Sequence, residues 1–344
     1  MKTAVFGKTK EGNDVTAYTI ANKNGMEITL LDFGAILHAI MLPNADGSKT
    51  DVALACPNME IYNENSKYLG STIAPNANRI GNAKLTIDGV EYSMEVNDGD
   101  NNLHTAFDTG MNKRLWKAEP ADNSVKFTAV VEDGEHGLPG NRVLTVTYTL
   151  TDDNEIKIEY TGTSDKNTII NMTNHTYFNL KGQGNGDILN HELWLNADSF
   201  TMTDDGGIPT GEIRKVEGTP LDFRVMKPIY KDNDINNEIM ALVNGYDHNY
   251  CINDWDGTMK KVAEVKEPET GRVMEVYSDL PGIQFYAGNY VEEDPGKEGT
   301  VYNKNYGLCL ETQYYPDHIN HPEFAQAVFG PGKDYATTTI YKFC

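Results

Sequence analysis

The chain of 344 residues is poor in cysteine, in basic residues and in long apolar runs. Its four cysteines stand far apart without a Cys-x-x-Cys pair, which predicts reduced, mostly buried thiols in a cytoplasmic protein and disfavours a cysteine-based zinc site. No apolar run reaches the ~18 residues that a membrane-spanning helix needs. The first residues also lack the apolar segment of a secretion signal.

Basic residues are outnumbered, since 29 Lys and Arg stand against 51 Asp and Glu, for a net charge of −22. Such a field repels nucleic acid and anionic membranes, so neither is expected as a partner. It favours a monomer, because like-charged copies repel one another. A content of 39% hydrophobic residues is nevertheless that of a globular protein with a large core.

Several sequence motifs of catalysis are missing as well. There is no phosphate-binding Walker loop, no His-Glu-x-x-His and no Gly-x-Ser-x-Gly. Residues 182–186 are glycine-rich, but their spacing and the lack of a following helix predict a flexible turn rather than a dinucleotide site.

What the sequence does contain is alternation of apolar and polar residues with period two. Residues 144–150 and 156–160 alternate on either side of a short Asp/Asn-rich loop, which predicts an antiparallel hairpin. Further strands are predicted at 26–31, 125–131, 169–178 and 283–290. Only residues 233–243 have helical spacing of apolar residues. We therefore expect an all-β fold, a large antiparallel β-sandwich with few short helices, in which residues 1–344 form a single domain.

Polar side chains gather in six places where they can do chemistry. The candidates are Asn78, Arg79, His104, His175, Asp247, Gln284 and Glu311. Any of them can instead satisfy backbone groups or cap a turn. Glu311 is different, because a carboxylate between Leu308 and Leu310 is costly to bury unless it is paired or used, and burial raises its pKa toward neutrality. With aromatic residues such as Tyr177 nearby, these groups can hold a sugar, whose hydroxyls need hydrogen bonds and whose apolar face needs a ring.

Over nearly the whole chain, the sequence resembles the aldose 1-epimerase (galactose mutarotase) family. The strongest match is residues 171–180, which fit the family's Asn-x-Thr-Asn-His-x-Tyr-Phe-Asn-Leu motif. Supporting matches are Asn78-Arg79-Ile80, Gly245-Tyr246-Asp247-His248, Pro281-Gly282-x-Gln284-Phe285-Tyr286 and Glu311-Thr312-Gln313.

The resemblance implies a galactose mutarotase-like supersandwich that interconverts the α and β anomers of free aldohexoses such as galactose and glucose. It implies Glu311 as general base and His175 as general acid, with His104 assisting. The implied sugar-binding residues are Asn78, Arg79, Asp247, Gln284 and Tyr177. In one departure, His104 is followed by Thr105 and Ala106 where the family usually has two glycines, so an altered loop is expected.

One carboxylate and one imidazolium suffice for this chemistry, so no cofactor and no catalytic metal is expected. A bell-shaped pH–rate curve is expected, with the carboxylate on the acid limb and the histidine on the basic limb. Residues 97–101 and 317–321 hold possible metal ligands without a full pattern, so a structural calcium stays open.

Three alternatives remain open from the residues alone. One is a non-catalytic carbohydrate-binding sandwich, and a second is an epimerase for a phosphorylated hexose, which would need a basic pocket. The third is a glycosidase in which Asp247 pairs with Glu311. The preferred aldose cannot be predicted, because C4 selectivity depends on fine placement of side chains.

Overall fold

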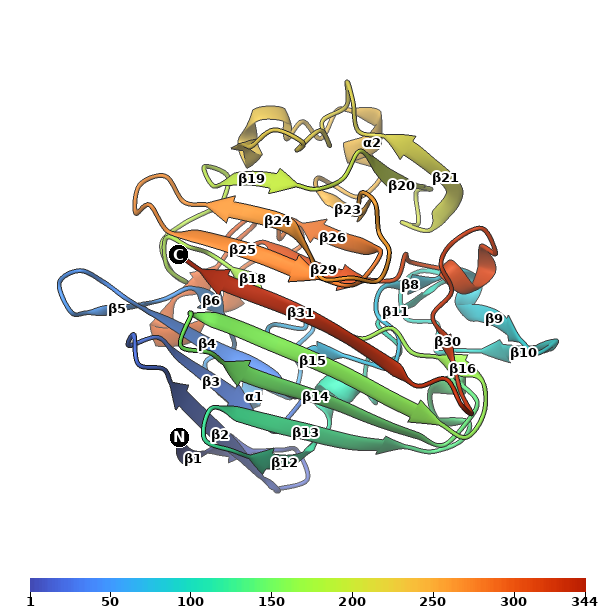
Figure 1. Cartoon of the computed structure of the whole chain (residues 1–344), viewed down its shortest axis with the longest axis horizontal. Helices are drawn as coiled ribbons and strands as arrows, with labels where there is room; N and C mark the ends of the chain where they lie inside the picture. Colours follow the sequence, from blue (N-terminus) through green and yellow to red (C-terminus); the bar gives the residue numbers. More distant parts are fainter.

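The computed structural model describes residues 1–344, and its extended strand ladders are all antiparallel (Figure 1). The largest sheet has nine strands. In spatial order they are β12 (Lys117–Pro120), β13 (Ser124–Val131), β14 (Arg142–Leu150), β15 (Glu155–Ser164), β31 (Tyr335–Phe343), β25 (Val273–Ser278), β24 (Lys260–Lys266), β19 (Glu192–Leu195) and β22 (Lys227–Pro228).

The predicted hairpin is the centre of this sheet. Strands β14 and β15 pair along their whole length, with Val146 opposite Tyr160 and Leu150 opposite Ile156. Alternate residues of both strands are buried, as a period of two requires when only one face of a sheet meets the core. The alternation therefore predicts both the pairing and the inward face.

Two five-stranded sheets cover the inner face of the large one. The first contains β1 (Lys2–Lys8), β2 (Asp14–Ala21), β3 (Glu27–Leu31), β4 (Ile36–Pro43) and β5 (Lys49–Asp51). The second, in spatial order, contains β21 (Pro209–Lys215), β20 (Ser199–Thr203), β23 (Asp247–Cys251), β26 (Gly282–Tyr286) and β29 (Cys309–Gln313).

A cluster of 58 buried residues joins the three sheets. Tyr18 of β2 packs edge-on against Phe127 of β13, with ring centroids 6.0 Å apart. On the other side, the hydroxyl of Tyr341 in β31 donates to the carbonyl of Leu310 in β29. The predicted all-β sandwich is thus confirmed.

The remaining elements are short. Two-residue strands pair as β6 (Ala53–Leu54) with β18 (Tyr177–Phe178), β7 (Thr72–Ile73) with β17 (Thr173–Asn174), β8 (Arg79–Ile80) with β11 (Asn102–Leu103), β16 (Thr168–Ile169) with β30 (Val328–Phe329), and β27 (Asp294–Pro295) with β28 (Val301–Tyr302). A tight hairpin joins β9 (Lys84–Ile87) to β10 (Val90–Ser93). Its turn residues Asp88 and Gly89 both have positive φ, as a two-residue hairpin of this twist demands.

Helices are few and short, as expected. They are α1 (Met59–Tyr62) and α2 (Glu238–Ala241), with six single turns of 3-10 helix at Gly81–Ala83, Met111–Lys113, Glu135–Gly137, Ile229–Asp232, Lys297–Gly299 and His318–Asn320. None of these helices has the length and apolar character needed to cross a membrane.

Three predicted elements are wrong in extent. The helix expected over 233–243 is only α2, because Asn237 is its N-cap and the exposed Ile235 lies outside it. The strand expected over 169–178 is broken into β16, β17 and β18. The strand expected over 283–290 ends at Tyr286, where the chain leaves the sheet.

Candidate active site

The second five-stranded sheet has one apolar and one polar face. Leu310 and Phe285 belong to the core cluster. Glu311 lies directly opposite Gln284 in the pairing of β29 with β26, and both point to the other face, because successive side chains of a strand alternate. This alternation explains how a carboxylate can stand next to leucines in sequence without pointing into the core.

His175 lies between the short strands β17 and β18, and backbone bonds fix it on both sides. Its N–H donates to the carbonyl of Ser71 at 2.8 Å, and its carbonyl accepts from the N–H of Gly70 at 3.0 Å. The side chain of Asn174 donates to Gly70 and accepts from Thr176. The polar residues of the 171–180 motif are therefore mostly structural and hold one catalytic candidate in place.

His104 and Asn78 fix each other from neighbouring loops. The backbone N–H of Asn78 donates to Nδ1 of His104 at 3.1 Å, and the N–H of His104 donates to the carbonyl of Asn78 at 3.1 Å. Because Nδ1 accepts a hydrogen bond, neutral His104 carries its proton on Nε2. This histidine is therefore a hydrogen-bond donor.

The altered loop after His104 keeps the histidine in place. Thr105 has φ +74°, a conformation that is strained for a β-branched residue and free of strain for glycine. Its hydroxyl donates to the carbonyl of Asn76 at 2.8 Å and accepts from the N–H of Asn76 at 3.0 Å. These two bonds hold Thr105 in this conformation.

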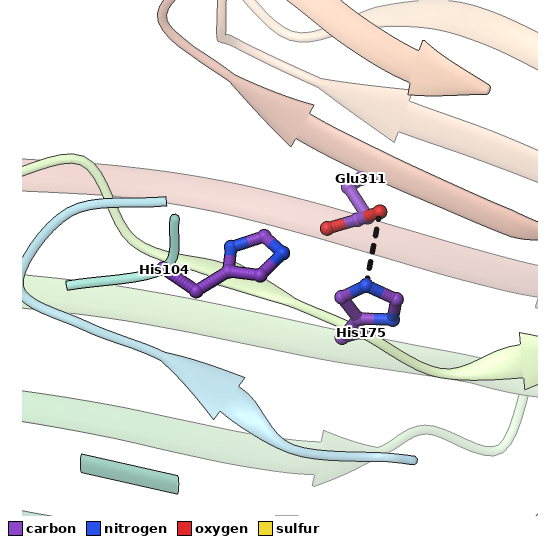
Figure 2. A group of neighbouring side chains, drawn as sticks. All are labelled: His104, His175 and Glu311. Atoms are coloured by element: carbon purple, nitrogen blue, oxygen red, sulfur yellow. Dashed lines mark ion pairs between the residues drawn. The ribbon is translucent and has the colours of Figure 1, made fainter. Parts of the chain in front are cut away.

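One cavity brings together all eight residues that the sequence indicated. The space inside it, including the part open to solvent, is about 640 Å³. Figure 2 shows His104, His175 and Glu311 with their polar groups directed toward one another. The other residues that line it are Ser66, Lys67, Tyr68, Asn78, Arg79, Leu103, Tyr177, Asp247, Gln284, Tyr286 and Tyr290.

Sequence reasoning did not assign Lys67, Tyr68 or Tyr290 to the site. Tyr68 and Tyr290 lie in loops, where no periodicity marks a residue as facing a cavity. Tyr68 has a positive φ of 56° and stacks on His175 with ring centroids 5.9 Å apart. The positive φ is visible only in the structure.

The central pair is Glu311 with His175, whose Oε1 and Nε2 atoms are 3.6 Å apart. Both side chains are almost fully buried, and Oε2 of Glu311 has no hydrogen-bond partner. Burial, reinforced by the like charge of Asp247, raises the pKa of Glu311 well above its usual value. Burial lowers the pKa of His175 to about 4.

This order of pKa values runs opposite to the one that the sequence-based expectation assumed. That expectation placed the carboxylate on the acid limb and an imidazolium on the basic limb of the pH–rate curve. Burial acts on the two groups in opposite directions, because it disfavours the charged form of each. Burial therefore favours placing the single proton of the pair on Glu311 rather than on His175.

Arg79 and Asp247 also line the cavity, and Asp98 contacts Arg79 from outside it. Nε of Arg79 donates to Asp98 at 2.7 Å, and its Nη1 lies 4.0 Å from Asp247. Burial alone would lower the pKa of Arg79, but the two carboxylates raise it overall. Asp247 in turn accepts from Nε2 of Gln284 at 2.7 Å. The positive charge of Arg79 is thus matched by acidic groups.

Beneath these residues lies a chain of buried amides centred on Gln313. Its Nε2 donates to Asn249 at 3.1 Å and to Gln284 at 3.2 Å, and its Oε1 accepts from Asn78 at 3.4 Å. Gln313 shares the polar face of β29 with Glu311, two residues away. It therefore ties Gln284 and Asn78, from two walls of the cavity, to the strand that carries Glu311.

Three side chains in the cavity have metal-ligand chemistry. Donor atoms of His104, His175 and Glu311 lie within 4.8 Å of one another. His104, however, carries its neutral-form proton on the ring nitrogen that faces the cavity, so it donates where a metal would need a lone pair. This arrangement fits hydrogen bonding to a ligand better than ligation of a metal.

The two other segments with possible metal ligands use these groups within the protein. In residues 97–101, Asp98 pairs with Arg79, and the Asn97 side chain bonds both the N–H and the carbonyl of Leu103. In residues 317–321, Nε2 of His321 lies 2.9 Å from the carbonyl of Pro209. These contacts use Asn97, Asp98 and His321 within the protein.

Comparison with known proteins gives one consistent family. A profile described as Aldose 1-epimerase matches residues 16–342. The chain is 38% identical over 340 residues to a galactose mutarotase from Mus musculus, covering 98% of this chain and 97% of that protein. It is 37% identical over 336 residues to an aldose 1-epimerase from Escherichia coli K12, covering 97% of this chain and 96% of that protein.

Solved structures agree with the sequence comparison. A GalM/aldose epimerase homologue from C. elegans superimposes with a TM-score of 0.87 at 31% identity, covering 95% of this chain and 98% of that chain. A galactose 1-epimerase from Lactobacillus acidophilus gives 0.85 at 27% identity, covering 100% of this chain and 99% of that chain.

Proposed function

The chain belongs to the aldose 1-epimerase family, and from this premise we propose that Glu311 and His175 open and reclose the ring of a free aldohexose. Membership makes the protein a carbohydrate isomerase that interconverts the α and β anomers of aldoses. The substrates proposed are galactose and glucose. What remains to be assigned is how the cavity performs the reaction.

Ring opening requires two proton transfers at one anomeric centre. A base removes the proton of the C1 hydroxyl, an acid protonates the ring oxygen, and the C1–O5 bond breaks to give an aldehyde. After rotation about C1–C2, the same groups act in reverse and the ring closes on the other face. Glu311 is the proposed base and His175 the proposed acid, and a sugar seated across both bridges their 3.6 Å separation.

The pKa order suits the intermediate of this reaction. Before ring opening the active form has a Glu311 carboxylate and a His175 imidazolium. Once the ring is open, the proton balance leaves Glu311 protonated and His175 neutral. That second arrangement is the one that burial favours. The site is therefore complementary to the open-chain sugar, the state closest to both transition states.

The sugar-binding shell follows from the cavity walls. Asn78, Arg79, Asp247 and Gln284 present donors and acceptors to ring hydroxyls, and Nε2–H of His104 assists near the reacting oxygens. Tyr177 lines the same cavity, with its ring 5.1 Å from that of His175 and its hydroxyl bonded to the carbonyl of Lys67. Its proposed role is an aromatic wall that also supports the acid.

The alternatives are not favoured. A phosphorylated hexose would need several free cations at the cavity. Arg79 is already paired with Asp98 and lies beside Asp247, which leaves Lys67 as the one lining cation outside an ion pair. A purely binding module would not need a buried carboxylate with a free oxygen next to an imidazole. For a glycosidase the second carboxylate would be Asp247, which is bonded to Gln284 and lies beside Arg79.

The proposal also includes the cofactor requirement, the number of domains, the oligomeric state and the location of the protein. The chemistry needs only the two side chains, so we propose no cofactor for catalysis, with a structural calcium left open. A core shared by residues from Tyr18 to Phe343 supports a single domain. A net charge of −22 supports a monomer, and three buried free cysteines support a cytoplasmic location.

The observation that carries the proposal is the buried pair itself, with Oε2 of Glu311 unpartnered in the cavity. Polarimetry of freshly dissolved α-D-galactose tests it, with galactose 6-phosphate and an aryl galactoside as parallel substrates. We expect rapid mutarotation of galactose, much slower reaction of the phosphate and no release of aglycone. Mutarotation no faster than in buffer would overturn the proposal.

A further inference from the structure

The two ring nitrogens of His175 meet two side chains of the same strand. Nε2 faces Oε1 of Glu311 at 3.6 Å, and Nδ1 lies 3.5 Å from Sγ of Cys309. Cys309 and Glu311 are two residues apart on β29 and so share its polar face. Cys309 is completely buried and is the one side chain within hydrogen-bond distance of Nδ1.

We propose that Cys309 is a positioning residue whose sulfur accepts the Nδ1–H of His175, so that Nε2 alone exchanges a proton with the sugar ring oxygen. This inference rests on the function proposed above. In the acid form of His175 both ring nitrogens carry a proton. Nε2–H passes to the ring oxygen as the C1–O5 bond breaks, while Nδ1–H stays on the ring. On closure the oxygen returns its proton to Nε2.

Sulfur suits this position because it is a weak hydrogen-bond acceptor. A carboxylate at the same place would stabilise the imidazolium and make it a poorer acid. Burial, followed by the charges of Glu311 and Asp247, raises the pKa of the Cys309 thiol well above its usual value, so the sulfur stays neutral. A neutral, weak acceptor orients the His175 ring without raising its pKa much. The pKa of His175 therefore stays at about 4, the value that burial gives it.

The other titratable and charged groups around His175 do not contact its Nδ1 atom. Glu311 faces Nε2, and Asp247, Arg79 and His104 line the same cavity. Three tyrosine rings surround the imidazole, with centroids at 5.9 Å for Tyr68, 5.1 Å for Tyr177 and 6.3 Å for Tyr286. Burial raises the pKa of all three tyrosines, so they stay neutral. The backbone of His175 itself acts against the effect of burial on the pKa of His175 but does not outweigh it.

The test uses two variants of Cys309. One replaces the sulfur by a stronger hydrogen-bond acceptor, and the other removes the acceptor. In Cys309→Ser the hydroxyl oxygen holds Nδ1–H more strongly, so we expect the acid limb of kcat to move to higher pH by about half a unit or more, with KM for galactose within about twofold. In Cys309→Ala the ring loses its partner, and kcat falls by roughly tenfold at neutral pH. Cys251→Ser is the matched control, a buried cysteine on β23 that does not line the cavity.

A spectroscopic measurement on the wild-type chain reads the tautomer of His175 and needs no Cys309 variant. In ¹⁵N NMR of histidine-labelled protein, with His175 assigned by the loss of its signals in His175→Asn, we expect the neutral ring to carry its proton on Nδ1. A neutral ring protonated on Nε2 would overturn the inference. So would a pH profile of Cys309→Ser and Cys309→Ala that matches Cys251→Ser.

The outcomes also separate this inference from the proposed function. If His175→Asn were fully active, the proposed function would fail. If His175→Asn is inactive while both Cys309 variants keep the wild-type profile, only the role of Cys309 fails.

Discussion

Oε1 of Glu311 lies 3.6 Å from Nε2 of His175, although the two residues come from segments far apart in the chain. Strand β29 supplies the carboxylate, and the link between β17 and β18 supplies the imidazole. Their burial pushes the two pKa values in opposite directions, so the pair behaves as one titrating unit that holds a single proton.

The first prediction concerns the pH dependence of the rate. Between the two macroscopic pKa values the pair carries one proton and is active. Below that range His175 and Glu311 are both protonated, and above it both have lost their protons. We expect a bell in which the acid limb reflects a second proton on His175, whose pKa is about 4, and the basic limb reflects the raised pKa of Glu311.

The check is an NMR titration of His175 beside the pH–rate curve. The ring should not titrate in the range of the basic limb. A His175 midpoint that coincides with the basic limb would restore the opposite assignment.

The second prediction concerns stability at low pH. Burial lowers the pKa of His38 to about 3 and of His175, His191, His248 and His318 to about 4. Between pH 6.5 and 4 the unfolded chain binds more protons at these sites than the folded chain, so stability rises with pH there. Acidification from pH 7.5 to 5.5 should lower the free energy of unfolding by about 1 kcal/mol per histidine.

Urea unfolding at constant ionic strength measures this loss. Glu311 and Asp247 oppose it, since their raised pKa values add stability that is lost as pH rises. An unfolding free energy that is unchanged or larger at pH 5.5 would show that these histidines do not dominate the pH dependence of stability.

The third prediction concerns Arg79, whose guanidinium is held by Asp98. In Asp98→Asn the ion pair is lost and the guanidinium is less well fixed. We expect KM for galactose to rise about three- to tenfold with a smaller change in kcat, because a contact common to bound sugar and transition state is weakened. Asp100→Asn, in the same loop, is the control and should match the wild type. Equal KM values for both variants would remove Asp98 from this role.

The fourth prediction concerns Gln313, the centre of the buried amide chain. Gln313→Met keeps the volume but leaves the buried oxygens of Asn249 and Gln284 without their donor. We expect a loss of roughly 1–3 kcal/mol in the free energy of unfolding. The KM for galactose should rise as well, since Gln284 and Asn78 lose their anchor. Denaturant unfolding and polarimetry measure the two effects, and a variant as stable as the wild type would contradict the network.

Much of the fold and site could be predicted from the sequence, for physical reasons. Period-two alternation identified β14 and β15 because each buries only one face. Polar residues in otherwise apolar strands, above all Glu311, indicated a site because burying them without use is costly. The structure gathers all eight candidates in one cavity, while their roles remain a proposal.

Other features depend on tertiary contacts that no local pattern encodes. The contact of Cys309 with His175 arises only when β29 meets the link after β17. Asp98 resembled part of a metal loop, yet its partner is Arg79. The helix expected over 233–243 is observed only over Glu238–Ala241, because Ile235, one of the apolar residues that gave the helical spacing, is exposed.

The most direct test of the account is polarimetry of α-D-galactose with Glu311→Gln, His175→Asn and the double variant, each shown to unfold at the wild-type midpoint. Each single substitution should lower kcat by ~10²–10⁴-fold, the usual contribution of a positioned proton-transfer group. Both residues serve the same ring-opening step, so their effects should not add. We expect kcat of the double variant to be only slightly below that of the less active single variant. A single variant within a few-fold of wild-type activity would contradict the claim that these two side chains carry the reaction.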